Sequence, residues 1–252
     1  MEREPFSLSG KHALVTGGGS GIGRAIARAF VNAGAYVTVT GRTESSLRDT
    51  VAELGSLADY AVHDVTDTGK TVTLVEELEA RRPVDILVNN AGRHQKLPTL
   101  DTTDEAIRDV IDTNLLAVLS LSRECARHMV KRSGGSILMV LSMASLFGIP
   151  QVSAYTASKA GLAGLVRQLA VEWGPQGVRV NGIAPGFIDT AMSRKALDND
   201  PPRKARVLTR TPLGRLGAVE EVAESAVFLS APSGSYITGV ILPVDGGTSI
   251  GF

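Results

Sequence analysis

The stretch His12–Ala33, HALVTGGGSGIGRAIARAFVNA, decides the fold of this 252-residue chain. It begins with a short apolar run, His12–Thr16, which is typical of a buried strand. A glycine-rich turn follows, Thr16–Gly23, and Ile22–Ala33 then carries apolar residues at helical spacing and stops before Gly34, a residue that often ends helices. The order strand, glycine-rich turn, helix predicts the first half of a βαβ unit.

The same alternation of short β-rich runs and longer amphipathic segments continues along the chain. Leu162–Trp173 repeats the helical spacing. Further apolar runs of strand length are Tyr36–Thr40, Ala58–Val62, Ile86–Val88, Ser136–Leu141, Val178–Ile183 and Val240–Val244. Near-continuous apolar strands separated by helices predict a parallel sheet that is covered on both faces. We therefore expect one doubly wound, Rossmann-like α/β domain over residues 1–252, with a seven-stranded parallel sheet, helices on both faces and an N-terminal tail at residues 1–9.

Composition excludes several classes of protein. The 26 Lys+Arg balance the 26 Asp+Glu, which argues against a general binder of nucleic acid. A lone Cys125 cannot form an internal disulfide, and the His residues lack metal-ligand spacing, so we expect no metal site. Met1–Ser9 is no signal peptide, and the uncharged run Ser133–Ser158 is too interrupted to span a bilayer. These features predict a soluble, cytoplasmic protein without a membrane partner.

The glycine-rich turn has the chemistry of a phosphate site. Gly17, Gly21 and Gly23 are spaced GxxxGxG, and glycines allow a ligand to approach the backbone closely. The N-terminus of the following helix offers free N–H groups and the positive end of the helix dipole. The alternative is a tight strand-to-helix turn without a ligand.

The end of the second predicted strand bears on the choice of nucleotide. Folds that select NAD usually place Asp or Glu there to bind the ribose 2′-hydroxyl, whereas a nearby Arg accommodates a 2′-phosphate. Here the strand ends in Thr40-Gly41-Arg42, without an acid. Arg42 therefore favours NADP(H). NAD(H) stays possible, because Ser20 adds no second basic group and Arg42 could be a solvated arginine.

Tyr155 and Lys159 are four residues apart on a predicted helix, so they share one helical face. A nearby cation favours phenolate and lowers the pKa of a tyrosine, which would make Tyr155 a general acid or base for a carbonyl or an alcohol. Ser142 follows a predicted strand and could donate a hydrogen bond to the same substrate oxygen. The alternative for Ser142 is an ordinary hydroxyl at a strand end.

From about Leu8 to Gly247 the chain resembles the short-chain dehydrogenases/reductases. Thr16–Gly23 matches the TGxxxGxG loop of that family, and Asn89–Gly92 matches its NNAG motif. Asp64 and Val65 resemble its adenine-contacting pair. The resemblance, together with Arg42, assigns cofactor binding to Gly17, Ser20, Gly21, Ile22, Gly23, Arg42, Asp64, Val65, Asn90, Ala91, Gly92, Tyr155, Lys159, Pro185, Gly186, Ile188 and Thr190.

The resemblance also implies a catalytic set of Asn114, Ser142, Tyr155 and Lys159. In that scheme Tyr155 transfers the proton, and Lys159 lowers its pKa and holds the nicotinamide ribose. Ser142 polarises the carbonyl, and Asn114 positions a water that connects Lys159 to solvent. The nicotinamide carries the hydride. Members of the family usually form homotetramers, so we expect one here.

Two basic segments bear on the substrate, which we expect to be a small carbonyl compound or alcohol. Arg93–Lys96 (RHQK) follows the NNAG motif, and a predicted substrate lid at residues 190–211 has six Lys or Arg against two Asp, 6 − 2 = +4. An anionic substrate such as a sugar acid would suit these charges, which could alternatively be solvated side chains. Three segments, Arg127–Val130, Val180–Gly186 and Arg210–Pro212, resemble gluconate 5-dehydrogenase-type members, which act on a sugar acid or polyol. The alternatives are a 3-oxoacyl-carrier-protein reductase and a non-catalytic nucleotide-binding module.

Overall fold

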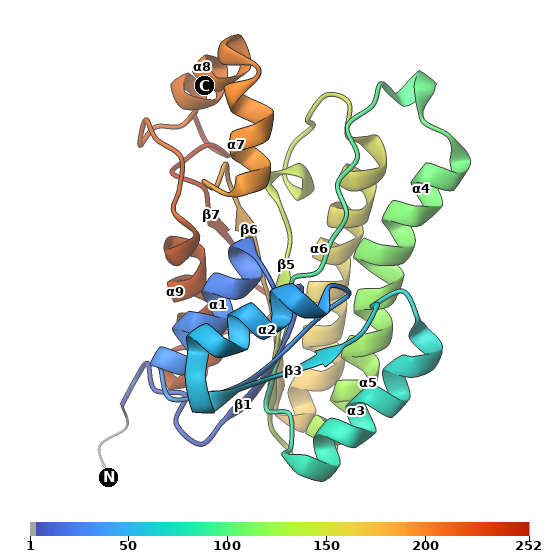
Figure 1. The fold of residues 1–252 in the computed structure, drawn as a ribbon, viewed down its shortest axis with the longest axis vertical. Helices are drawn as coiled ribbons and strands as arrows, with labels where there is room; N and C mark the ends of the chain where they lie inside the picture. The colour runs from blue at the N-terminus through green and yellow to red at the C-terminus, as the bar shows by residue number, and fades with distance from the viewer. Residues whose placement is uncertain (1–3, 252) are drawn as a thin grey trace.

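A computed structural model describes residues 4–251, apart from the side chains of residues 192, 195, 196 and 198. The described residues form a seven-stranded sheet in which every pair of neighbouring strands is parallel (Figure 1). The strands are β1 (His12–Thr16), β2 (Tyr36–Gly41), β3 (Ala58–Val62), β4 (Ile86–Asn89), β5 (Gly135–Val140), β6 (Val178–Pro185) and β7 (Ile241–Val244).

The strand order creates a crevice at one edge of the sheet. It runs β3-β2-β1-β4-β5-β6-β7, so the chain winds outward in one direction from β1 and in the other direction from β4. The loops that leave the carboxyl ends of β1 and β4 therefore separate, and ligands of doubly wound folds bind at this point. The predicted fold class is confirmed.

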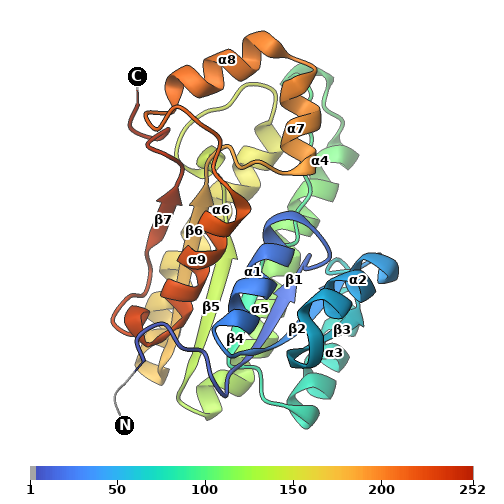
Figure 2. The same ribbon diagram turned by 60° about the vertical axis from the view of Figure 1, so that its left-hand side comes forward.

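Helices cover both faces of the sheet. Helices α1, α2 and α9 lie on one face and α3, α5 and α6 on the other, while α7 and α8 stand beyond the carboxyl ends of the strands (Figure 2). Their bounds are α1 (Gly21–Asn32), α2 (Glu44–Leu54), α3 (Thr68–Arg81), α4 (Asp104–Ile111), α5 (Ala117–Lys131), α6 (Ser153–Trp173), α7 (Ala191–Asp198), α8 (Pro201–Arg210) and α9 (Val219–Ser230). A π-helical segment, Asp112–Leu116, joins α4 to α5.

Two hydrophobic cores result, one on each face. Successive side chains of a strand point to opposite faces, so Leu14 belongs to the core under α5 and α6 and Val15 to the core under α1 and α9. Phe30 of α1 and Leu162 of α6 are fully buried in these cores. Each such side chain contributes about 1.5–3 kcal/mol through its burial. The cores fix the strand ends, and thereby the loops that carry the site.

Several boundaries differ from those that the sequence predicts. Helix α6 starts at Ser153, so the predicted helical positions Tyr155 and Lys159 and the predicted helical segment Leu162–Trp173 belong to one continuous helix. Leu8, in the predicted tail, is 1% exposed, and its N–H donates to the carbonyl oxygen of Ala33 at 2.7 Å. Gly34 follows α1 with φ +92°, as expected for a residue that ends a helix. The rest of the predicted tail includes residues 1–3, which lie outside the described residues.

Among the described helices none is both long enough and apolar enough to cross a membrane. The same residues contain no group of three or more His, Cys, Asp or Glu side chains placed to hold a metal ion.

Candidate active site

The glycine-rich loop between β1 and α1 is tied to the loop after β4. The side chain of Asn90 donates to the carbonyl oxygens of Thr16 at 2.9 Å and Gly17 at 3.3 Å. A Cβ atom on Gly17 would lie 2.9 Å from Nδ2 of Asn90, and the φ of +66° is unfavourable for other residues. Asn90 therefore shapes the loop from the side, while Ala91 and Gly92 continue along the crevice.

Thr16, which the sequence reasoning did not assign, connects the same two loops. Its Oγ1 accepts hydrogen bonds from the N–H groups of Asn90 and Ala91, both at 3.0 Å, and donates to the carbonyl oxygen of Val88 at 3.3 Å. The signal in the sequence is its position as the last residue of β1, directly before Gly17. Thr16 is a positioning residue for the crevice.

The N-terminus of α1 is open to an anion. Ser20 occupies the N-cap position without a side-chain hydrogen bond to the helix, and the first turn has no acidic residue. The N–H groups of Gly21, Ile22 and Gly23 therefore lack the side-chain partners that usually satisfy them. Arg24 holds the loop by donating to the carbonyl oxygen of Gly19 at 2.6 Å.

The carboxyl ends of β2 and β3 bring Arg42 close to Asp64. Nη1 of Arg42 lies 4.0 Å from Oδ2 of Asp64, and the arginine side chain is 77% exposed. Hydrogen bonds from Thr66, and in addition the charge of Arg42, lower the pKa of Asp64. Val65 follows Asp64 and is half-buried. Arg42 is thus loosely held and can turn toward a ligand at this end of the crevice.

The structure brings Tyr155, Ser142 and Lys159 together, as the sequence predicts for them. Ser142 follows β5, and its hydroxyl accepts from the N–H of Ala144 and acts on the phenol of Tyr155, whose pKa it tends to lower. The ammonium of Lys159 lies 5.6 Å from the centre of the Tyr155 ring. Lys159 is only 4% exposed, and its Nζ donates to the carbonyl oxygen of Val140 at 2.7 Å.

The pKa of Tyr155 departs from the predicted direction. Burial raises the pKa of its phenol, although the hydrogen bond with Ser142 opposes this. Burial also lowers the pKa of Lys159 to about 8. Lys159 does not contribute the expected lowering, and the loss of solvation on burial determines the direction for the phenol.

Asn114 is held in place by its own side chain. Its amide nitrogen donates to the carbonyl oxygen of Arg93 at 2.9 Å and to Oγ of Ser158 at 3.1 Å, while Oδ1 accepts from the N–H of Arg93 at 2.7 Å. Both amide hydrogens are therefore used. Oδ1 can accept two hydrogen bonds and accepts one from Arg93, so one acceptor position remains. The residue lies in the π-helical segment, a feature often found at functional sites.

The predicted residues after β6 border the crevice from its other side. Pro185 ends the strand, and a Cβ atom on Gly186 would lie 2.6 Å from Cα of Asp245, so this position requires glycine. Ile188 is buried. Thr190 caps α7, since its Oγ1 accepts from the N–H of Ser193 at 3.1 Å.

These residues fit a dinucleotide. An uncapped helix start suits a pyrophosphate. Lys159 has three N–H donors and one protein acceptor, which leaves donors for ribose hydroxyls. The phenol of Tyr155 lies beside them and could donate a proton to the carbonyl oxygen of a substrate.

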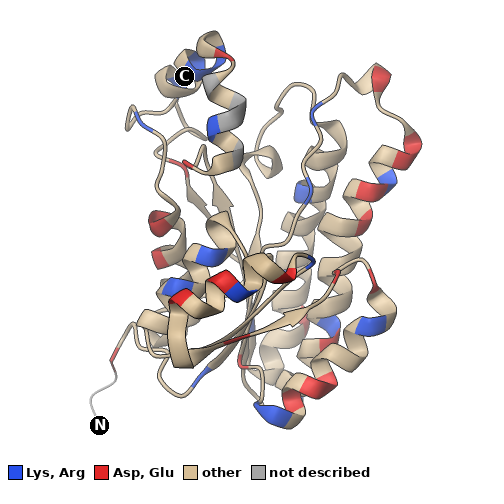
Figure 3. Cartoon of the chain, in the orientation of Figure 1, with Lys and Arg blue, Asp and Glu red and all other residues tan. Residues whose placement is uncertain are grey.

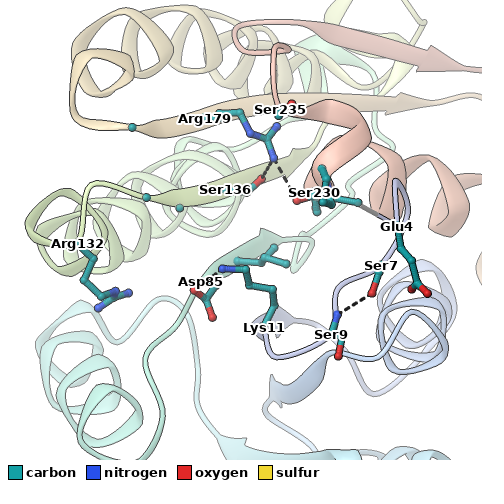
Figure 4. A pocket seen from close by; sticks show the side chains of 16 residues that line it. Glu4, Ser7, Ser9, Lys11, Asp85, Arg132, Ser136, Arg179, Ser230 and Ser235 are labelled. Carbon is teal, nitrogen blue, oxygen red and sulfur yellow. Dashed lines mark hydrogen bonds and ion pairs between the residues drawn. The ribbon is translucent and has the colours of Figure 1, made fainter. Parts of the chain in front are cut away.

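A cavity of about 660 Å³ lies at the opposite, amino edge of the sheet (Figure 4). Its cations have protein partners: Lys11 pairs with Asp85 at 3.3 Å, and Arg132 pairs with Glu79 at 2.6 Å. Arg179, which also lines it, donates to backbone carbonyl oxygens. None of the predicted site residues lines this cavity, so it is separate from the candidate active site.

Comparison with known proteins agrees with this geometry. A model of the short-chain dehydrogenases/reductases, described as enoyl-(acyl carrier protein) reductase, matches residues 17–249. The chain is a short-chain dehydrogenase/reductase. It is thus an oxidoreductase that interconverts an alcohol and a ketone with NAD(P).

Three relatives of this short-chain dehydrogenase/reductase illustrate its neighbours. It is 40% identical to 2-dehydro-3-deoxy-D-gluconate 5-dehydrogenase of Bacillus subtilis, over 97% of this chain and 96% of the relative. It is 40% identical to a 3-oxoacyl-(acyl-carrier-protein) reductase of Salmonella typhimurium, over 96% and 98%. A gluconate 5-dehydrogenase of Burkholderia cenocepacia, solved with NADP and tartrate, is 32% identical over 99% of both chains, with a TM-score of 0.95.

Proposed function

We propose that this enzyme reversibly reduces a keto sugar acid to the corresponding hydroxy acid, with NADP(H) as the preferred cofactor. The placement of Tyr155 beside the buried Lys159 carries the proposal, because it puts a proton donor and a cation together at the carboxyl edge of the sheet. The sugar-acid relatives, one of them solved with the hydroxy acid tartrate, support the substrate class. The basic residues on the lid support an anion (Figure 3).

In the proposed mechanism the residues of the chain handle the proton and orient the substrate. When bound, the nicotinamide supplies or accepts the hydride. Ser142 donates a hydrogen bond to the substrate oxygen and polarises the carbonyl. Tyr155 donates its phenolic proton to that oxygen in reduction and takes it back in oxidation. Because burial raises the pKa of Tyr155, the protonated form that reduction requires is favoured at neutral pH.

Lys159 and Asn114 support this proton transfer. The ammonium of Lys159 is proposed to hold the ribose hydroxyls with the donors that Val140 does not use. A water between Lys159 and solvent would donate a hydrogen bond to the remaining acceptor position on Oδ1 of Asn114 or to a backbone carbonyl oxygen there. The other cofactor-binding residues named from the sequence complete the proposed dinucleotide site.

The preference for NADP(H) over NAD(H) rests on Arg42. Its guanidinium is exposed, makes one long contact with Asp64, and can form paired hydrogen bonds with a 2′-phosphate. The NADP-bound relative supports the same choice.

A steady-state panel tests substrate and cofactor. It compares 5-keto-D-gluconate, neutral keto sugars and an acetoacetyl thioester, each with NADPH and NADH. We expect the highest kcat/KM for a keto acid with NADPH. Strong acetoacetyl activity with inert keto acids would replace this proposal by the alternative, a 3-oxoacyl-acyl-carrier-protein reductase, which the 40% identical Salmonella relative favours.

The proposal extends to assembly and location. We propose a single domain with a lid at residues 190–211, and a homotetramer that covers exposed apolar side chains such as Val171 on α6 and Tyr236. Sedimentation at low protein concentration tests this, and a monomer would contradict it. A cytoplasmic location is consistent with the lone Cys125, which is buried and unpaired.

A further inference from the structure

The loop after β4 places His94 against the predicted catalytic tyrosine. The rings of His94 and Tyr155 meet edge to face, with centroids 4.8 Å apart and an interplanar angle of 64°. Such edge contacts are favourable and define the orientation of both rings. His94 therefore lies directly beside the predicted proton donor, Tyr155.

Backbone hydrogen bonds hold this loop on both sides of His94. The preceding residue, Arg93, is bound through its N–H and carbonyl oxygen to the amide of Asn114, at 2.7 and 2.9 Å. Three residues after His94, the N–H of Leu97 donates to the carbonyl oxygen of Gln151 at 2.9 Å. The imidazole thus projects from a segment that is fixed at two points.

Helix α8 presents one face to the same region. Arg203, Val207 and Arg210 are spaced i, i+4 and i+7, so they lie on one side of the helix. Val207 is 7% exposed, and the guanidinium of Arg210 lies 4.4 Å from the centre of the Phe147 ring. This face is therefore turned toward the body of the protein, and Arg203 is half-buried whereas Arg206 is exposed. Of the other lid charges, Lys195 and Asp198 have side chains outside the described residues.

The charges of two cations act on His94, that of Lys96 from its own loop and that of Arg203 from α8. Burial, and then the charges of Arg203 and Lys96, lower the pKa of His94. Within residues 4–251, no described carboxylate forms an ion pair with Arg203 or Lys96. By contrast, the neighbouring Arg93 pairs with Asp109 at 2.7 Å. Unneutralised cations close together favour the binding of an anion.

We propose that His94 and Arg203 form the binding subsite for the carboxylate of a keto or hydroxy acid, and so select charged substrates over neutral ones. This inference rests on the proposed reduction of a ketone at Tyr155. The guanidinium of Arg203 offers two parallel donors to the carboxylate, and the imidazole of His94 offers one. Because α8 brings Arg203 to the site, the lid takes part in recognition as well as in coverage.

A pair of substrates that differ only in the carboxylate separates this inference from the proposed function. In 5-keto-D-gluconate and L-sorbose the reacting ketone has the same neighbours, and the distal carboxylate of the first is a CH₂OH group in the second. For Arg203→Ala, we expect KM for 5-keto-D-gluconate to rise by about 10-fold or more, as for the loss of a charge-assisted contact. We expect KM for L-sorbose to change by less than about 2-fold, and kcat to be retained with both.

Matched variants control for general effects on the lid. Arg206→Ala removes an exposed arginine of the same helix and should leave both KM values unchanged, and Arg203→Lys should restore part of the selectivity. The proposed subsite is wrong if Arg203→Ala raises the KM values for both substrates equally, or raises neither. If the wild-type enzyme reduces no keto sugar or keto acid, the proposed function fails instead.

A binding measurement tests the subsite without turnover. The pair NADP⁺ and 5-keto-D-gluconate cannot react, because both are oxidised. We expect this mixture to raise the pKa of His94 in an NMR titration, because a bound carboxylate stabilises the imidazolium form. The carboxylate thereby offsets the charges of Arg203 and Lys96, which lower the pKa in its absence. NADP⁺ with L-sorbose should leave it unchanged, and His94→Gln assigns the signal among the four histidines. A His94 signal that does not respond to the keto acid contradicts the proposal.

Discussion

Two cations at opposite edges of the sheet, the half-buried Arg179 and the buried Lys159, have opposite surroundings. At the amino edge, Arg179 donates to the carbonyl oxygens of Leu229, Ser230 and Ile237 at 2.6, 3.1 and 3.2 Å, and to Oγ of Ser136 at 3.4 Å. At the carboxyl edge, Lys159 donates to the carbonyl oxygen of Val140. Burial lowers the pKa of both side chains.

The surrounding charges repeat this difference. At the amino edge Lys11 and Arg132 are paired with carboxylates. At the carboxyl edge the charges of Arg203 and Lys96 act on His94, and neither residue has an ion pair among the described residues. A buried cation whose donors are satisfied by the protein stabilises the fold, whereas one with unused donors is available to a ligand. The amino edge is therefore a structural edge of the sheet, and the carboxyl edge is its binding edge.

The largest effect that we expect concerns Tyr155 at the binding edge. Tyr155→Phe removes the proton donor but keeps the ring that contacts His94. We expect kcat to fall by about 100-fold or more, as for the loss of a general acid, with nucleotide affinity nearly unchanged. Steady-state rates and nucleotide titration measure the two. Retention of more than a few per cent of kcat would contradict the assigned role of Tyr155.

At the structural edge, Arg179→Ala should act on stability instead. It leaves the carbonyl oxygens of Leu229 and Ser230 without their side-chain donor, whereas that of Ile237 keeps a hydrogen bond from the side chain of Asn181. We expect the free energy of unfolding to fall by about 2–4 kcal/mol, while kcat of the folded enzyme is retained. Urea denaturation measures the change, and Lys11→Ala, at an exposed ion pair, serves as the control with a change of less than about 1 kcal/mol. Equal stabilities of the two variants would remove the distinction between the edges.

Lys159→Met should change the free energy of unfolding of the nucleotide-free protein in the opposite direction to Arg179→Ala. The buried charge is destabilising, so its removal should raise the free energy of unfolding by about 1–3 kcal/mol. Since the pKa of Lys159 is lowered to about 8, the folded state releases this proton before the unfolded state does. The stability of the wild type should therefore gain on that of the variant as pH rises above 8 toward the ordinary lysine pKa. A pH series of denaturation curves in which the difference stays constant would refute the assigned charge state.

The smallest effect concerns Arg42, at the outer end of the binding edge. Arg42→Asp replaces a phosphate ligand by a ribose acceptor and should shift the ratio of kcat/KM values for NADPH and NADH by about 10-fold or more toward NADH. The ratio is used because it cancels general losses of activity. An unchanged ratio would show that Arg42 does not bind the 2′-phosphate.

The fold was predictable because its signals are local. His12–Thr16 and Ala58–Val62 are strands with the predicted bounds, since short β-rich runs end at glycine or polar residues. The first turns of α6 have no apolar stripe, because they hold Tyr155 and Lys159 at the site, and only the spacing of these two residues indicated a helix there. The predicted lowering of the pKa of Tyr155 failed for a related reason: spacing gives proximity to a cation but says nothing about solvation.

The sequence by itself determined the fold class, the glycine-rich loop and the spacing of Tyr155 and Lys159, all of which depend on neighbours along the chain. Only the tertiary structure decided that His94 contacts Tyr155 and that the charge of Arg203 acts on His94 from α8. It also decided that Arg179 is satisfied by carbonyl oxygens while Lys159 keeps unused donors. Such differences depend on burial and on partners distant in the chain, and these exist only once the strands and helices are packed.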